Sequence, residues 1–191
     1  MIHLPLPLVI LAGGKSSRMG ADKALLPFGD FATLTQFQMH RLTPHVESLH
    51  VSCKSRAKFD FETSFIEDIA TYEQNSPLIA LLSILNSLER ASCVLSVDTP
   101  FVSIEIFKKL YEAMQPNSDA IVARSPFGAH PLCAIYSPSL KHSIVDMLEK
   151  NEHKIGNLLR SSNTVYVDFE EDAPFFNVNH PEEYTQAKGL L

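Results

Sequence analysis

A group of glycines and cations near the start of the sequence has the residue types of a phosphate-binding loop. The stretch LAGGKSSRMGADKALLPFG covers residues 11–29. Its glycines and cations up to residue 23 are Gly13, Gly14, Gly20, Lys15, Arg18 and Lys23. Backbone N–H groups at glycine can approach a phosphate closely because no Cβ intervenes. Arginine adds a forked donor and lysine a compact charge, so we expect this stretch to bind phosphate groups.

The glycine spacing excludes two common phosphate-loop patterns. The pattern GxxxxGK[ST] would use the GKS of residues 14–16, but its first glycine would then fall at Val9. The pattern GxGxxG fails because Gly13 and Gly14 are adjacent and the next glycine is Gly20. The loop is therefore typical neither of a P-loop ATPase nor of a dinucleotide-binding protein.

The elements that must position this loop follow from the hydrophobic pattern. Short apolar runs alternate with stretches of helical spacing, which predicts strands alternating with helices. Strands are predicted at residues 6–13, 46–53, 65–68, 92–98, 119–125, 130–137 and 163–169. Helices are predicted at residues 31–42, 77–90, 103–114 (with Ser103 as N-cap), 139–150 and 180–191. This alternation predicts an α/β fold with a mostly parallel, Rossmann-like sheet and helices on both faces.

Polar residues at the ends of the predicted strands are candidates for a shared site. In open α/β sheets, ligands bind beyond the carboxyl ends of the strands. Residues 13–23, Ser52, Asp68 and Asp98 all end or follow predicted strands. We therefore expect them to converge on one cleft.

Composition narrows the class of protein. The net charge of −6 argues against a nucleic-acid-binding surface, which is normally basic. No apolar run approaches the roughly 18 residues of a membrane helix, so no membrane association is expected. Cys53, Cys93 and Cys133 lie too far apart for a CxxC metal site, and their odd number does not suggest a disulfide framework. A reducing cytoplasm and a monomer are expected.

The sequence resembles a known enzyme family from end to end. Residues 11–29 resemble LAGGxSxRMGxDKxLLPxxG, a signature of nucleotidyltransferases with the nucleotide-diphospho-sugar transferase fold. Further matching elements follow in the family's order: IED at 66–68, SPLIALLSIL from 76, VDTPF from 97, HPLCAIYS from 130 and FNVNHPEEY at 176–184. The combination is most similar to the molybdenum cofactor guanylyltransferases.

This resemblance implies a reaction, substrates and partners. The family transfers GMP from GTP to molybdopterin, with Mg²⁺ as cofactor, and releases pyrophosphate. One domain is implied, with a nucleotide-binding half at about 1–100 and a second-substrate half at about 101–191. Implied transient partners are a small GTP-binding accessory protein, the molybdenum insertase and chaperones of the acceptor enzymes. The alternatives are transfer from CTP to molybdopterin, transfer to a sugar phosphate, and a non-catalytic nucleotide-binding delivery protein.

The resemblance also implies roles for individual residues. The catalytic residues would be Lys23, Arg18 and Asp98, with Asp98 binding the Mg²⁺. The nucleotide would contact Leu11, Ala12, Gly13, Gly14, Lys23, Ser52, Asp68 and Asp98. The second substrate would lie near His130, Asn177 and Asn179, with the two asparagines on one side of a strand.

Several of these roles have a structural alternative. The cations of residues 15–23 could form a solvated basic turn. Asp98 could start an Asx turn, and Asp68 could be a solvated carboxylate at the end of a strand. A hydrogen-bonded structural role is the preferred interpretation of His130. Asn179 or His180 could instead be the N-cap of the last predicted helix.

Two departures from the family pattern concern the nucleobase. Ser76 and Ala80 stand where the family usually has glycine, beside the base, so guanine and cytosine selectivity are left open. Ser52 stands where relatives often have asparagine, and its hydroxyl has a shorter reach and no amide pair. Neither departure touches the predicted phosphate or metal positions.

Overall fold

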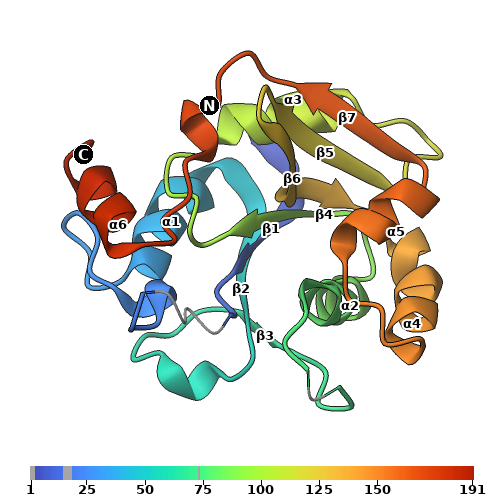
Figure 1. Ribbon diagram of the computed structural model, residues 1–191, viewed down its shortest axis with the longest axis horizontal. Coiled ribbons are helices and arrows are strands. Elements are labelled where there is room, and N and C mark those ends of the chain that lie inside the picture. Colours follow the sequence, from blue (N-terminus) through green and yellow to red (C-terminus); the bar gives the residue numbers. More distant parts are fainter. Residues whose placement is uncertain (1–2, 15–18, 73) are drawn as a thin grey trace.

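A single sheet organises the part of the chain that the structure, a computed structural model, describes: residues 3–14, 19–72 and 74–191. In these residues seven strands pair in the order β3-β2-β1-β4-β6-β5-β7 (Figure 1). They are β1 Leu4–Leu11, β2 Val46–Cys53, β3 Phe65–Glu67, β4 Ser92–Ser96, β5 Ala120–Ser125, β6 Gly128–Tyr136 and β7 Thr164–Asp168. Only β6 runs antiparallel to its neighbours, so the predicted mostly parallel α/β sheet is confirmed.

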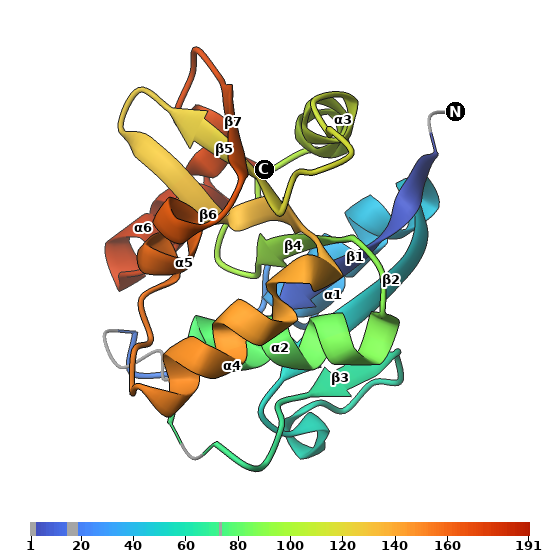
Figure 2. The same cartoon turned by 90° about the vertical axis from the view of Figure 1, so that its right-hand side faces the viewer.

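Helices cover both faces of the sheet (Figures 1 and 2). One face carries α1 Leu34–Leu42, α3 Ile104–Glu112 and α6 Pro181–Lys188, and the other carries α2 Pro77–Leu88, α4 Lys141–Glu149 and α5 Ile155–Ser161. Single 3₁₀ turns lie in the connections between strands and helices or between strands: η1 Lys23–Leu25, η2 Thr43–His45, η3 Arg56–Lys58, η4 Pro138–Leu140 and η5 Ala173–Phe175. None of the helices described is long and apolar enough to span a membrane.

The central strand β1 explains how one apolar run serves two cores. Its side chains alternate between the faces of the sheet, as a period of two requires. Leu8 and Ile10 belong to the core under α1 and α3, whereas Val9 and Leu11 belong to the core under α2 and α4. The run is therefore continuously hydrophobic. Gly13 and Gly14 follow its carboxyl end, so they lie near the middle of the row formed by the carboxyl ends of the parallel strands.

Several element boundaries differ from the sequence-based predictions for local reasons. The predicted helix at 31–42 begins at Leu34, because the Thr33 side chain accepts the Gln36 N–H as an N-cap. Ser103 is an N-cap by position, but its side chain makes no capping hydrogen bond. The strand predicted at 92–98 ends at Ser96. Helix α5 was not predicted, because seven residues are too few to show a helical period.

Candidate active site

A continuous cleft opens at the carboxyl ends of the parallel strands. The β1–β4 pocket, about 320 Å³, includes Gly13, Lys23 and Asp98 in its wall. It is flanked by the β2–β3 pocket, about 400 Å³, and by the β6 pocket, about 260 Å³. Ser96 and Leu132 line all three pockets, so the pockets are parts of one cleft.

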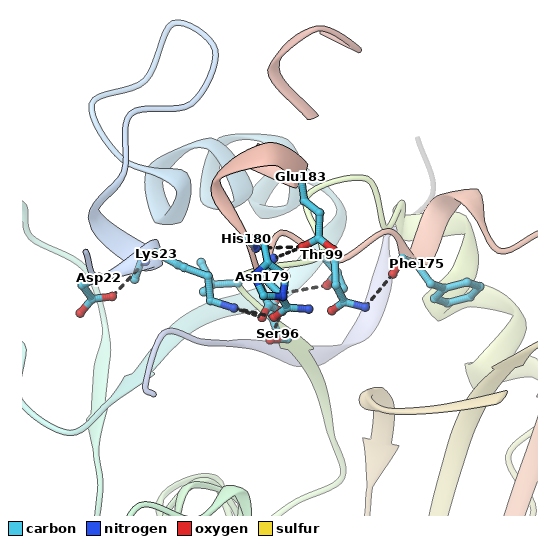
Figure 3. A network of polar contacts seen from close by, with 12 residues as sticks. Asp22, Lys23, Ser96, Thr99, Phe175, Asn179, His180 and Glu183 are labelled. Carbon is cyan, nitrogen blue, oxygen red and sulfur yellow. Dashed lines mark hydrogen bonds and ion pairs between the residues drawn. The ribbon is translucent and has the colours of Figure 1, made fainter. Parts of the chain in front are cut away.

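Lys23 occupies the centre of this cleft. It begins η1, whose N-cap is Asp22: one oxygen of that carboxylate, Oδ1, accepts the Ala24 N–H at 3.0 Å. The Lys23 ammonium donates to Asp98 Oδ2 at 2.5 Å and to Asn179 Oδ1 at 2.9 Å. Figure 3 shows the side chain reaching from η1 towards Asn179 and the end of β4. A positive charge is therefore held between two oxygen atoms.

Asp98 follows β4 and faces two of the three pockets. Its carboxylate accepts the Ser96 hydroxyl at 2.5 Å as well as the Lys23 ammonium. An Asx turn would need this carboxylate to accept a nearby backbone N–H. In the described part of the chain its hydrogen-bond partners are the two side chains instead, and the turn is closed by Thr99 Oγ1 donating to Ser96 O at 2.8 Å. The carboxylate is thus directed into the cleft.

The glycines after β1 give the cleft an open wall. Gly14 has a φ of +124°, which side-chain-bearing residues rarely adopt, and a Cβ at Gly13 or Gly14 would meet no atom of the described residues within 4 Å. Ala12 is fixed by its N–H, which donates to Ser52 O at 2.8 Å. Leu11 lies at the β2–β3 pocket and Ala12 at the β1–β4 pocket. The predicted role of Arg18 falls outside the described residues.

The β2–β3 pocket contains two polar side chains with unused hydrogen-bonding atoms. Ser52 Oγ and Asp68 Oδ1 are buried and have no hydrogen-bond partner in the residues described. Burial raises the pKa of the Asp68 carboxyl, and the nearby Lys54 charge acts in the opposite direction. Buried polar atoms of native proteins are normally satisfied. These two atoms are therefore hydrogen-bonding groups that the described residues leave unused in the side chains that line this pocket.

The amino end of α2 forms the rim of the same pocket. Ser76 is its N-cap, with Oγ accepting the Leu78 N–H at 3.2 Å, and its φ of −145° is extended backbone open to any residue. Ser83 fixes the chain after β3, because its hydroxyl accepts the Ile69 N–H at 2.9 Å. Because of this cap and this backbone conformation, a serine at position 76 stabilises the start of α2 without backbone strain. Ala80, one turn further along α2, lines the pocket.

The β6 pocket contains His130 in a hydrogen-bonded and stacked position. Its Nε2 lies 2.9 Å from Ser125 Oγ and 3.7 Å from Asp172 Oδ1. Its ring stacks on Phe175 at a centroid separation of 4.1 Å and an interplanar angle of 7°. Burial lowers the pKa of His130, and the Asp172 charge opposes that shift. The preferred structural interpretation fits this geometry, although the ring also lines the cleft.

The two asparagines near the end of the chain do not share one side of a strand. In the described chain no strand is formed at 176–179, and one backbone bond, from the Val178 N–H to Asp98 O at 2.8 Å, attaches this segment to the loop after β4. Asn177 lines the β6 pocket, whereas Asn179 lines the β1–β4 pocket. The predicted strand is therefore not formed in these described residues, and the two asparagines line neighbouring pockets of the same cleft.

Some residues of the cleft were missed by the sequence analysis. Ser96 was overlooked, although it lies two residues before Asp98 in the stretch predicted as a strand at 92–98. Glu183 holds the Asn179 segment in place, since its carboxylate accepts the N–H groups of Asn179 at 2.6 Å and His180 at 2.9 Å (Figure 3). His180 is the N-cap of α6 by position. The acidic residue three positions after a cap was the available signal.

Comparison with known proteins decides the family. The sequence profile of the MobA-like NTP transferase domain matches residues 8–165. The chain belongs to this family. A molybdenum cofactor guanylyltransferase from Campylobacter jejuni is 41% identical over 184 residues, which cover 96% of this chain and 95% of that protein. A probable molybdenum cofactor guanylyltransferase from Bacillus cereus is 32% identical over 189 residues, covering 94% of each.

Solved structures confirm the fold. A molybdopterin-guanine dinucleotide biosynthesis protein A from Archaeoglobus fulgidus superposes with a TM-score of 0.84 at 21% identity, covering 97% of this chain and 98% of that one. A 2-C-methyl-D-erythritol 4-phosphate cytidylyltransferase from Thermus thermophilus superposes with a TM-score of 0.71 at 18% identity, covering 98% of each. Members of the MobA-like family thus share their fold with nucleotidyltransferases that act on other substrates.

Proposed function

We propose that this chain is a nucleotidyltransferase that transfers GMP from GTP to molybdopterin and releases pyrophosphate. The observation that carries the proposal is the Lys23–Asp98–Asn179 cluster, which lies at the strand ends with a further pocket on either side. Two substrates can therefore approach one charged centre from opposite directions. The names of the relatives at 41% and 32% identity support the choice of substrates.

In this reaction the protein's main task is to position phosphates and balance their charge. A phosphate of the acceptor attacks the α-phosphate of GTP, and pyrophosphate leaves. Lys23 supplies a compact positive charge where the triphosphate would lie, and the backbone of Gly13 and Gly14 allows close approach. Preorganised charges of this kind stabilise developing negative charge without reorganisation during the step.

The oxygen atoms around Lys23 suit a magnesium ion. Mg²⁺ prefers oxygen ligands and is usually held by one or two carboxylates together with substrate phosphates. The Asp98 carboxylate and the Asn179 amide oxygen are such donors, and both already contact a cation, the Lys23 ammonium. A bound Mg²⁺ would neutralise phosphate charge and orient the triphosphate. We propose that Asp98, assisted by Asn179, holds it.

The β2–β3 pocket is the proposed site for guanine. Guanine presents two neighbouring donors, N1–H and the N2 amino group, and a carboxylate can accept both. Asp68 offers a buried oxygen without a partner in the described residues, and Ser52 adds a hydroxyl nearby in the same pocket. Cytosine presents a donor beside an acceptor on its pairing edge, which matches a carboxylate less well. The donor pattern of guanine therefore favours GTP over CTP.

The β6 pocket is the proposed site for molybdopterin. It shares Ser96 and Asp98 with the β1–β4 pocket and lies on the other side from the β2–β3 pocket. Asn177 offers polar groups at its wall, and the stacked pair of His130 and Phe175 offers a flat one. We further propose a cytoplasmic location, where the three free and buried cysteines would stay reduced.

Pyrophosphate release by the purified protein tests the proposal. The assay contains magnesium and molybdopterin, with GTP, CTP, ATP or UTP supplied in parallel. We expect release with GTP and its loss, by at least about a hundredfold, in Asp98→Ala, because the charge balance at the centre of the cleft is removed. The matched control is Asp146→Ala on α4, whose side chain is about half exposed. Circular dichroism verifies that each variant is folded.

The other outcomes separate the alternatives. Release with CTP alone would keep the mechanism and replace the nucleotide. Release only after a sugar phosphate takes the place of molybdopterin would replace the acceptor. A folded protein that binds GTP but releases no pyrophosphate with any acceptor would point to a nucleotide-binding delivery protein instead.

A further inference from the structure

Lys58 connects two walls of the β1–β4 pocket without lining it. Its ammonium donates to Ala12 O at 2.7 Å and to Asp22 Oδ2 at 2.6 Å. Ala12 and Asp22 both line the pocket, and they directly precede Gly13 and Lys23 in the sequence. One ammonium group therefore joins the segment that follows β1 to the segment that begins η1.

Asp22 would be unfavourable in this pocket without a counter-ion. Its carboxylate stands in the wall of a cavity proposed to take a triphosphate, and like charges repel. The carboxylate has a structural task, since its Oδ1 accepts the Ala24 N–H and caps the turn that carries Lys23. Pairing with Lys58 through Oδ2 offsets the negative charge and leaves the cap intact.

The connection between β2 and β3 holds Lys58 in place. The Arg56 N–H at the start of η3 donates to Glu67 Oε1 at 2.7 Å. The ring of Phe59 stacks on Phe65 at 5.2 Å, and the Lys58 ammonium lies 5.0 Å from the Phe59 ring centroid. These contacts fix the base of a long side chain, so less conformational entropy is lost when its ammonium binds Asp22.

We propose that Lys58 is a positioning residue for the triphosphate. Its charge neutralises Asp22, and its two hydrogen bonds keep the Ala12 and Asp22 segments at the separation that the β1–β4 pocket needs. The proposal rests on the proposed function, because it takes this pocket to be the triphosphate site. Lys58 acts through Asp22 and Ala12 and need not contact the nucleotide.

The proposal makes the effect of Lys58 depend on the charge of the ligand. Binding of GTP, GDP and GMP is measured by calorimetry without the second substrate. In Lys58→Met we expect GTP to bind about tenfold more weakly, the scale of one charge-assisted hydrogen bond, with a smaller loss for GDP and the smallest for GMP. Lys58→Gln, which keeps a donor but no charge, should show the same ranking. An equal loss for all three nucleotides would mean a general packing defect and would overturn the proposal.

The matched control is Arg56→Met, which removes the same charge from the same 3₁₀ turn. In the described part of the chain, the Arg56 side chain makes no hydrogen bond or ion pair, so GTP binding should stay at the wild-type level. If Arg56→Met weakens GTP binding as much as Lys58→Met, the effect comes from the general positive charge of this turn. The Lys58–Asp22 ion pair would then have no specific role, and the proposal fails. Thermal unfolding checks that the variants remain folded.

A double-mutant cycle isolates the pair. Asp22→Asn removes the repulsive charge, so Asp22→Asn/Lys58→Met should bind GTP more tightly than Lys58→Met alone. In turnover, Lys58→Met should raise the KM for GTP more than it lowers kcat. Additive losses in the cycle would overturn the proposal.

Measurements on the wild type and on Lys58→Met together distinguish failure of the role of Lys58 from failure of the proposed function. Wild-type protein that binds GTP and releases pyrophosphate supports the proposed function whatever Lys58 does. Unchanged GTP affinity in folded Lys58→Met, within about twofold, then overturns the role of Lys58 alone. Wild-type protein that binds no nucleotide would overturn both.

Discussion

At the scale of single residues, the Asp68 carboxylate is costly to bury but leaves a hydrogen-bond acceptor beside the β2–β3 pocket that the described residues do not use. Burial of its carboxylate disfavours the charged form, as its raised pKa shows, and Oδ1 has no partner in the residues described. A protein with no ligand to bind there would gain stability by replacing the group. Its retention is explained if the missing hydrogen bonds come from a nucleobase in the β2–β3 pocket.

Asp68→Asn should exchange nucleotide selectivity for stability. The amide can accept one donor of guanine but not two through equivalent oxygens, so the preference for GTP over CTP in kcat/KM should fall by about tenfold. The melting temperature should stay level or rise, since a buried charge is removed. The exposed Asp60→Asn serves as the control. An unchanged GTP-to-CTP ratio would remove Asp68 from base recognition.

At the scale of elements, helix α1 supports the loop that carries Asp98. Gln38 is fully buried on the apolar face of α1, and its Nε2 donates to Thr99 O at 3.0 Å and more weakly to Val97 O at 3.5 Å. Arg41, one turn further on, donates to Pro100 O and Val102 O. These hydrogen bonds explain why an amide occupies the core face of this helix, because α1 holds carbonyl groups on both sides of Asp98.

Gln38→Leu should impair turnover more than stability. It removes the hydrogen bond to Thr99 O but also removes Gln38 Oε1, which is buried without a partner in the described chain, so the loss in unfolding free energy should stay below about 2 kcal/mol. We expect kcat to fall about tenfold, because the Asp98 loop is less fixed. Gln36→Leu lies on the same helix, and among the described residues its side chain bonds only to the N-cap Thr33, so this variant should keep wild-type kcat. A wild-type kcat in Gln38→Leu would contradict this role of α1.

At the scale of the whole molecule, the cleft joins the early strands of the sheet to the late ones. β1 and β2 supply the glycine wall and Ser52, whereas β6 and η5 supply His130 and Phe175 on the far side of β4. His130 links three elements, since it contacts Ser125 at the end of β5, Phe175 in η5 and the Asp172 carboxylate beside it. Its protonation state therefore affects how the carboxyl-terminal half is held together.

This linkage predicts a pH dependence of stability. The pKa of His130 is lowered by burial from the ordinary value of 6.5, so the unfolded chain takes up the proton first as the pH falls. Stability is therefore lost as the pH drops below about 6.5, until the folded state also binds the proton. In His130→Asn the free energy of unfolding should fall less steeply between about pH 7 and pH 5.

Chemical denaturation at a series of pH values measures the slope, which does not depend on the absolute stability of the variant. His50, whose pKa is also lowered by burial, keeps its own part of the slope in His130→Asn. The exposed His142→Asn, which makes the same substitution at the surface, is the matched control. Equal slopes in the wild type and His130→Asn would show that protonation of His130 does not contribute to the pH dependence of stability.

The sequence by itself determined the features that depend on neighbouring residues. Alternation of apolar runs with helical spacing predicted the α/β class, and the continuous run of β1 followed by Gly13 and Gly14 predicted a phosphate-binding loop at a strand end. Boundaries at Thr33 and Ser76 follow from their capping side chains, which local pattern could have placed. These signals survive in a single sequence because they arise from backbone periods and adjacent side chains.

Only the tertiary structure decided which distant residues meet. Lys23 and Asn179 lie 156 positions apart, and the residues next to them in the sequence do not predict their contact. The same holds for Lys58 with Ala12 and Asp22, and for the separation of Asn177 from Asn179 into different pockets. Such contacts depend on strand order, on the reversed direction of β6 and on the path of loops between elements. These are properties of the packed chain as a whole, and no local pattern encodes them.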